Sequence, residues 1–341
     1  MENFDYPIGR TVLGNAAAIA AAYGSFKKLA PDEARLLPTP ADAFPAVRRT
    51  LAGEAAVDGI GTFRGSERQT LVFAPSARPG WWIRREDLPE QLDIAVDIAN
   101  LWTSAQNLVL RSGSPHNYLR MVEHIIALKP GLGVDDVLIK VKSGDPPLFA
   151  DSSRPLTEAM DRAGIVETDR PAEYVTVREP VAFGGERGDF LLFLPAEGGD
   201  RRLRIDCAIS WNTVIGDERV VFDVTDATFR YASWARTNAT HRQYLMVKTV
   251  GKLFAAWRNL GYDEKNILIH GPKRFYTEPR FPVGGKFLEP VWHRATLDLM
   301  AALALIGPGR FCGTVVSNRA GHTLDCDALR ALRRHELIVR L

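Results

Sequence analysis

Cysteine is scarce in this sequence, and the few that occur are far apart. Cys207, Cys312 and Cys326 make an odd number and contain no CxxC pair. A disulfide framework is therefore excluded, and the pattern is typical of a chain that folds in a reducing compartment. We expect three buried, unreacted thiols.

Long apolar runs and an excess of one charge are also absent. No stretch reaches the roughly 18 apolar residues that a membrane-spanning helix needs, and the alanine-rich residues 16–22 lack the basic start of a signal peptide. The formal net charge is +2 at pH 7, which gives no electrostatic argument for nucleic acid as a partner. We therefore expect a soluble protein of the cytoplasm without an integral membrane segment.

Three parts of the chain differ in their predicted secondary structure. Residues 1–52 have helix-forming residues over 15–29, a helix start at Pro31-Asp32-Glu33-Ala34 and a short helix near 46–51. We expect this part to be a helical arm that serves docking or self-association. Residues 53–168 and 169–341 each run from short strands to helices, which predicts two related sheet-plus-helix sandwich domains. The fold class is therefore α+β with an added N-terminal helical arm.

Local signals place the individual elements. Strands are expected at 69–74, 81–84, 136–141, 190–194, 202–209 and 313–317. Helices are expected at 117–128, 154–164, 243–260, 290–306 and from about residue 325. The helix over 243–260 repeats apolar residues at helical spacing, which indicates core packing for most of them.

Histidine is the other scarce residue type that matters, because the chain has only 7. We expect surface or structural roles for the four in ordinary contexts, which are His116, His241, His270 and His335. The three with informative neighbours are His124, His293 and His322.

Glu123 and His124 are adjacent within the helix expected over 117–128. Neighbouring helical side chains point about 100° apart, so His124 can bind a metal ion while Glu123 stands beside a water molecule. Zinc lowers the pKa of bound water, and a carboxylate can take its proton. The pair suits a hydrolase, although a Glu-His pair on its own is more often structural.

His293 begins the second candidate segment, and Asp298 follows it after five residues. Ligand pairs on one helix face use spacings of three or four, and side chains five apart diverge by about 140° on a regular helix. The two can share a metal ion only if the helix contains a one-residue bulge. Glu289 precedes Pro290 and is expected to cap this helix.

His322 follows Gly321 in the loop after the strand expected at 313–317. Glycine permits a sharp turn that can bring the next side chain into a pocket, and loops at strand ends commonly carry catalytic groups. A loop histidine on the surface is the alternative.

Several short segments occur in the order and spacing of one known family. They are Gly59-Ile60-Gly61, Val122-Glu123-His124-Ile125-Ile126-Ala127, Gly131-Leu132-Gly133-Val134-Asp135, Pro147-Leu148-Phe149, Ala235-Arg236-Thr237, Glu289-Pro290-Val291-Trp292-His293 and Gly321-His322. From near Asp58 almost to its end, the chain resembles the UDP-3-O-acyl-N-acetylglucosamine deacetylase family, the zinc enzymes of lipid A biosynthesis.

This resemblance implies a role for each matching residue. The implied Zn²⁺ ligands are His124, His293 and Asp298. The implied catalytic residues are Glu123 as general base, His322 as cationic general acid and Thr237 as oxyanion donor. The implied substrate contacts are Arg294, Gly321 and Phe63. The implied reaction hydrolyses the N-acetyl amide of an acylated amino-sugar nucleotide and releases acetate.

Two departures from the family pattern leave alternatives open. Ala302 stands where the family has an aspartate that supports the catalytic histidine, so we expect His322 to lose an orienting carboxylate and some basicity. The five-residue spacing from His293 to Asp298 is the other departure. One alternative is a catalytically impaired homologue that binds a sugar-nucleotide or lipid in a regulatory or scaffolding role. Another is an interaction protein that acts through its N-terminal arm.

Overall fold

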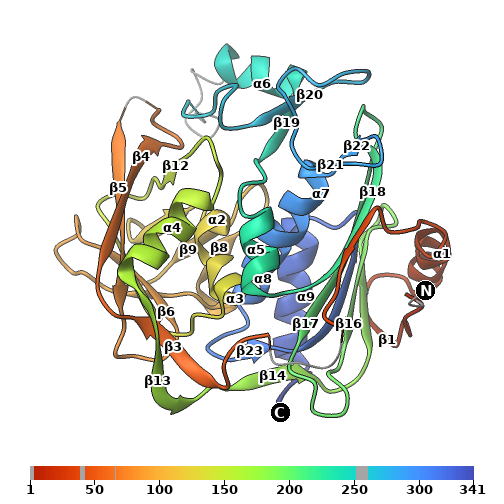
Figure 1. Cartoon of the computed structure of the whole chain (residues 1–341), viewed down its shortest axis with the longest axis horizontal. Helices are drawn as coiled ribbons and strands as arrows, with labels where there is room; N and C mark the ends of the chain where they lie inside the picture. Colours follow the sequence, from red (N-terminus) through yellow and green to blue (C-terminus); the bar gives the residue numbers. More distant parts are fainter. Residues whose placement is uncertain (1–3, 39–42, 66, 251–259) are drawn as a thin grey trace.

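The computed structural model describes residues 4–38, 43–65, 67–250 and 260–341. Two large sheets form the sides of the molecule, and most of the helices lie between them (Figure 1). The chain is thus a mixed α+β protein, as the sequence predicted.

The first large sheet has six strands and is built from residues 55–148. In spatial order its strands are β12 (Pro147–Leu148), β4 (Ala55–Gly61), β5 (Arg68–Pro75), β11 (Val137–Val141), β6 (Trp81–Arg85) and β7 (Ile94–Ala95). The strands expected at 69–74, 81–84 and 136–141 are confirmed.

The second large sheet has seven strands. In spatial order they are β1 (Arg10–Leu13), β15 (Val181–Gly184), β16 (Phe190–Leu194), β24 (Gly313–Asn318), β17 (Leu203–Trp211), β18 (Gly216–Asp223) and β2 (Glu33–Arg35). Both outermost strands come from the N-terminal 52 residues, so this part of the chain completes the two edges of the sheet.

Short helices pack between the two sheets and carry most of the candidate site. The helices between or beside the sheets are α2 (Glu123–Ile126), α3 (Leu128–Leu132), α4 (Arg154–Ala163), α5 (Asp226–Ala232), α7 (Glu289–His293), α8 (Met300–Ala304) and α9 (His322–Arg334). Helix α6 (His241–Lys248) lies at the top of Figure 1, beside β19 (Asn238–Thr240) and β20 (Leu268–His270). The remaining strands are β3 (Val47–Leu51), β8 (Leu101–Thr103), β9 (Val109–Arg111), β10 (Tyr118–Arg120), β13 (Ile165–Pro171), β14 (Tyr174–Val177), β21 (Pro282–Val283), β22 (Lys286–Phe287), β23 (Arg310–Phe311) and β25 (Ile338–Arg340), with a 3₁₀ turn at Ile98–Asn100.

The seven-stranded sheet is buried on both faces, which explains its continuous apolar strand Phe190–Leu194. Leu191 and Phe193 belong to the main core between the sheets. Phe190, Leu192 and Leu194 point the other way, into a second core covered by α1 (Ala16–Phe26). Alternate residues of the strand therefore serve different cores.

Three helix predictions are wrong. The helix start at Pro31 is followed by strand β2, because Asp32 pairs with Arg219 through both its backbone N–H and its carboxylate. The short helix near 46–51 is strand β3, which pairs with β13. The helix over 117–128 begins only at Glu123, because β10 pairs with β9 and Met121 adopts a left-handed backbone with φ of 51°. Pairing with a distant strand overrides local propensity in the first two cases, and pairing with the neighbouring strand β9 does so in the third.

Two of the remaining helix predictions are confirmed, and a third is confirmed over its described residues. The helices expected at 154–164 and 290–306 are present, the second in three segments. The helix expected over 243–260 is present as α6 up to Lys248, and its continuation over 251–259 lies outside the described residues. The division at residues 52 and 168, and self-association through the N-terminal part, stay predictions.

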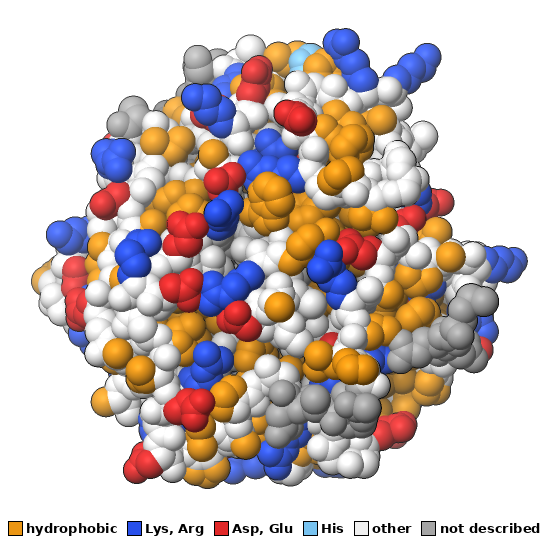
Figure 2. All heavy atoms as spheres, in the orientation of Figure 1, with side chains coloured by type: hydrophobic (Ala, Val, Ile, Leu, Met, Phe, Trp, Pro, Cys, Tyr) orange, Lys and Arg blue, Asp and Glu red, His pale blue; other side chains and the backbone are white. Residues whose placement is uncertain are grey.

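The surface and the cysteines agree with the composition. Figure 2 shows acidic and basic side chains interspersed over the face in view, without a field of one sign. Cys207, Cys312 and Cys326 are all buried. No helix in the described part of the chain is long and apolar enough to cross a membrane.

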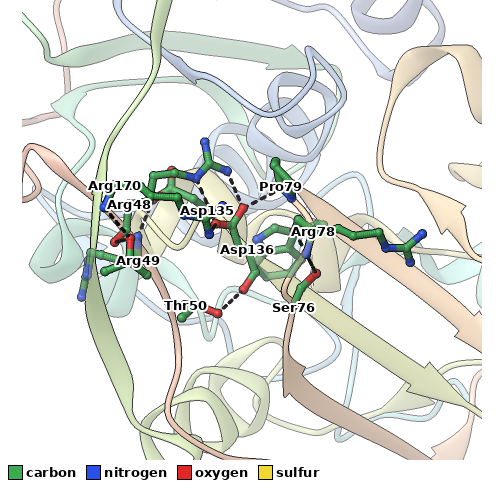
Figure 3. Close-up of polar contacts among 12 residues, drawn as sticks. Arg48, Arg49, Thr50, Ser76, Arg78, Pro79, Asp135, Asp136 and Arg170 are labelled. Atoms are coloured by element: carbon green, nitrogen blue, oxygen red, sulfur yellow. Dashed lines mark hydrogen bonds and ion pairs between the residues drawn. The ribbon is translucent and has the colours of Figure 1, made fainter.

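A buried ion cluster joins strand β3 to the start of β11. Asp136 is fully buried and accepts hydrogen bonds from Arg48 Nε at 2.9 Å, from Arg170 Nη2 at 3.0 Å and from the Gly80 amide at 2.7 Å (Figure 3). Next to it, Asp135 accepts from the Arg49 amide at 2.7 Å. A carboxylate satisfied from three directions is costly to remove, because the cations around it are left without a counter-charge.

We therefore expect Asp136→Ala to lower the free energy of unfolding by about 3–5 kcal/mol, because it strands the buried Arg48 guanidinium. Urea denaturation followed by circular dichroism measures the change. The matched control is Asp169→Ala at an exposed position, which should stay within about 0.5 kcal/mol of the parent. Equal stabilities of the two variants would contradict a structural role for the cluster.

Candidate active site

Helix α2 presents two side chains toward the space between the sheets. Glu123 is 4% exposed, and its Oε1 atom accepts the Leu108 amide and lies 3.7 Å from His322 Nε2. Burial raises the pKa of Glu123, although the nearby His322 opposes the shift. A carboxylate with a raised pKa is suited to take a proton near neutral pH.

His124 is held by hydroxyl groups at both ring nitrogens. Its Nδ1 lies 3.1 Å from Ser152 Oγ, and its Nε2 lies 3.1 Å from Thr237 Oγ1. The same Nε2 is 3.2 Å from the Nε2 of His293. Burial, with a contribution from His293, lowers the pKa of His124 to about 3, so the ring is neutral, as metal binding requires.

The helix that begins with Glu289 contains the bulge that the spacing of His293 and Asp298 requires. Six residues, Arg294–Leu299, form a π-helical turn between α7 and α8. In such a turn the hydrogen bonds join residues five apart instead of four. Asp298 therefore returns to the side of the helix that carries His293, and its Oδ2 lies 3.6 Å from His293 Nδ1. The condition that the sequence set for these two residues to share a metal ion, a bulge in the helix, is therefore met.

Asp298 lies between two imidazoles. Its second oxygen, Oδ1, is 3.6 Å from His322 Nε2. Burial alone would raise the pKa of Asp298, but His293 and then His322 outweigh it and lower the pKa below its usual range. The carboxylate is therefore ionised at neutral pH.

His322 is the first residue of α9, with Gly321 as the N-cap residue in an extended conformation. Burial works against a charged ring, but Asp298, Glu123 and then Asp325 outweigh it, and the pKa of His322 is raised. The expectation that Ala302 leaves His322 less basic than in family members with an aspartate there stays a prediction. Ala302 is a buried residue of α8, and other carboxylates surround the histidine.

Thr237 is fixed by an ion pair that the sequence did not indicate. Glu289 Oε1 accepts from the Arg236 amide at 3.0 Å and from Arg236 Nε at 2.7 Å. Glu289 also accepts from the Arg280 amide at 2.8 Å, so it secures neighbouring segments and does not cap α7 as expected. With this segment fixed, Thr237 Oγ1 lies 3.1 Å from both His124 Nε2 and His293 Nε2. A Glu-Pro sequence reads locally as a helix start, so this role carried no local signal.

The candidate residues line one cavity of about 520 Å³. Its polar lining includes Glu123, His124, Thr237, His293, Asp298 and His322. Its apolar lining includes Phe63, Met121, Trp211, Tyr244, Met246, Val247, Tyr262 and Ile267.

Helix α6 supplies part of the apolar lining instead of packing into the core. Tyr244 and Val247 line the cavity, whereas Leu245 is 48% exposed, and no residue of α6 is buried. The expectation of core packing is wrong for Leu245 and Val247, whereas Tyr244 packs against the small buried cluster of Tyr262, Ile267 and Ile269. The remaining apolar residues of that pattern, at 253, 254 and 257, lie outside the described residues.

The three residues expected to contact substrate have different surroundings. Phe63 lines the cavity, with the Arg120 guanidinium 4.3 Å from its ring centroid. Gly321 has open space around it. Arg294 is buried, and its guanidinium donates to Asp325 Oδ1 at 2.6 Å and to the Ala320 carbonyl at 2.8 Å. Their roles in substrate binding stay predictions, and Asp325 is a neighbour that the sequence did not single out.

The side chains of His124, His293 and Asp298 are of the types that bind zinc, but Asp298 does not yet point to the same place as the two histidines. Zinc takes histidine nitrogens at about 2.0–2.1 Å and carboxylate oxygens at about 2.0–2.2 Å. Two nitrogens on one tetrahedral zinc would then lie roughly 3.3 Å apart, and the Nε2 atoms of His124 and His293 are 3.2 Å apart. Asp298 faces the other nitrogen of His293, Nδ1, and its carboxylate must turn to join them. Accordingly, no three His, Cys, Asp or Glu side chains in the described ranges form a complete metal site as they stand.

Comparison with known proteins agrees with this arrangement. A family model described as LpxC, UDP-3-O-acyl N-acetylglycosamine deacetylase, matches residues 48–334. Proteins named UDP-3-O-acyl-N-acetylglucosamine deacetylase from Brucella ovis, Brucella abortus and Brucella melitensis are each 25% identical over 293 residues, which is 85% of this chain and 96% of the relative. The chain therefore belongs to the UDP-3-O-acyl N-acetylglycosamine deacetylase family.

Proposed function

We propose that this protein is a zinc-dependent deacetylase that hydrolyses the N-acetyl amide of an acylated amino-sugar nucleotide. The observation that carries the proposal is the meeting of Glu123, two facing imidazoles, Asp298 and His322 in one cavity. Membership of the family, whose members bear this activity in their name, supports the choice of substrate.

His124, His293 and Asp298 would hold the metal ion. Zinc in that position supplies a Lewis acid that polarises a carbonyl and lowers the pKa of a water molecule. The neutral His124 and the ionised Asp298 are already in the protonation states that ligands need.

The side chains around this position divide the proton transfers of amide hydrolysis. Glu123 takes a proton from a water molecule as the oxygen of that water attacks the acetyl carbonyl carbon. Thr237 donates its hydroxyl hydrogen to the oxyanion of the tetrahedral intermediate. His322, whose raised pKa favours the cationic form, gives its proton to the amine nitrogen as the C–N bond breaks. Acetate and a free amino sugar leave.

The apolar part of the cavity supports an acylated substrate. Met121, Tyr262 and Ile267 line it close to the polar cluster, and α6 adds Tyr244 and Val247. A fatty acyl chain fits such a lining because its burial removes apolar surface from water. A cytoplasmic setting is part of the proposal, and the scarcity of cysteine in the sequence supports it.

We expect wild-type protein with zinc to release acetate from a UDP-3-O-acyl-N-acetylglucosamine, and Glu123→Gln to lower kcat by about 10²–10⁴-fold. Glutamine keeps the shape of the side chain but cannot take a proton. Acetate release measured by a coupled assay tests this. The control is Glu158→Gln on the exposed face of α4, which should behave as wild type. Retained activity in Glu123→Gln would rule out its role as base.

A second prediction concerns the metal. Purified protein should contain about one zinc per chain, and both His124→Ala and Asp298→Ala should lose it, because a tetrahedral site with two protein ligands holds zinc weakly. Elemental analysis of dialysed protein measures this, with His335→Ala at an exposed position as control. Zinc retained in Asp298→Ala would exclude that ligand. Wild-type protein that binds no zinc would favour the catalytically impaired homologue.

A further inference from the structure

Among the residues that the structure describes, two buried polar atoms on helix α9 find no hydrogen-bond partner. They are Nδ1 of His322 and Oδ2 of Asp325, which belong to residues three apart in the sequence. Side chains at this spacing are neighbours on a helix surface, and the charges of these two interact. Because buried polar atoms are nearly always paired, the coincidence of two such neighbours needs an explanation.

The carboxylate of Asp325 is fixed from its other side. Arg294 Nη2 donates to Asp325 Oδ1 at 2.6 Å, and both side chains are almost fully buried. Arg294 is itself held by the Ala320 carbonyl at 2.8 Å and by Ser317 Oγ at 3.3 Å. One oxygen of Asp325 is therefore committed, and the other is free to accept a hydrogen bond on the side of α9 that carries His322.

The imidazole of His322 has one nitrogen in the cavity and one that could donate a hydrogen bond to such an oxygen. Its Nε2 faces Glu123 Oε1 at 3.7 Å and Asp298 Oδ1 at 3.6 Å, within the cavity. Its Nδ1 is the nitrogen without a partner. A neutral imidazole carries one proton on its two ring nitrogens. A nitrogen that donates a hydrogen bond keeps this proton, and the other nitrogen is then able to accept one.

We propose that Asp325, clamped by Arg294, is a positioning residue that accepts a hydrogen bond from Nδ1–H of His322. This contact keeps the proton of the neutral ring on Nδ1, so that Nε2 is the atom that exchanges a proton with the substrate. The two atoms make no hydrogen bond as the side chains stand, so the ring must turn toward Asp325 to complete the pair. The catalytic consequence rests on the proposed deacetylase function, whereas the contact itself does not.

The contact can be observed without any activity. In zinc-loaded protein labelled with ¹⁵N-histidine, the His322 ring signals are assigned by their loss in His322→Gln. We expect a hydrogen-bonded Nδ1–H proton in wild type and in the control Asp327→Asn, and its loss or a clear shift in Asp325→Asn. Asp327 is a suitable control because it is on the same helix and pairs with Arg330 at the surface. Unchanged His322 signals in Asp325→Asn would overturn the proposal.

The kinetic consequence separates positioning from substrate binding. Asp325→Asn should lower kcat by about 10–100-fold, with KM and zinc content unchanged, while Asp327→Asn keeps wild-type values. A loss in KM alone would overturn the positioning role. If wild-type protein releases no acetate, the deacetylase function fails and the NMR comparison still decides the contact. If Asp325→Asn does not fold, Arg294→Met/Asp325→Asn removes both buried charges and serves in the NMR comparison.

Discussion

The site depends on one wide helical turn. Without the π turn over Arg294–Leu299, His293 and Asp298 would point about 140° apart, and the carboxylate could not lie near both His293 and His322. The turn is held by packing, because Ala295, Thr296 and Leu297 within it are fully buried. It contacts α2 and α9, the helices that carry Glu123, His124 and His322. The π turn therefore accommodates the extra residue within the core, and His293 and Asp298 still face the same cavity as Glu123, His124 and His322.

The pKa shifts of the titratable groups in this cavity have two different causes, burial and neighbouring charges. Burial alone favours the neutral form of these groups, and it decides the direction of the pKa shift at His124, which is lowered, and at Glu123, which is raised. At Asp298, His293 and then His322 outweigh burial and lower the pKa, whereas at His322 the carboxylates of Asp298 and then Glu123 outweigh it and raise the pKa. One cavity therefore combines a neutral imidazole, a buried carboxylate whose pKa is raised and a histidine whose pKa is raised by neighbouring carboxylates.

Local sequence signals predicted the strands at 69–74, 81–84 and 136–141, the helix at 154–164 and five of the polar residues that meet in the cavity, whereas Thr237 was implied only by the family resemblance. They failed where distant pairing decides, as at Glu33–Arg35 and Val47–Leu51, which are strands and not helices. They also missed Asp325 and the anchoring role of Glu289, since an ion pair such as Arg294–Asp325 joins residues 31 positions apart.

The most direct test of this account is a crystal structure of the zinc-loaded protein with anomalous data collected at the zinc edge. The account predicts one zinc peak within about 2.0–2.2 Å of His124, His293 and Asp298, with the π turn intact. A zinc ion bound without Asp298, or a regular α-helix across Arg294–Leu299, would contradict it.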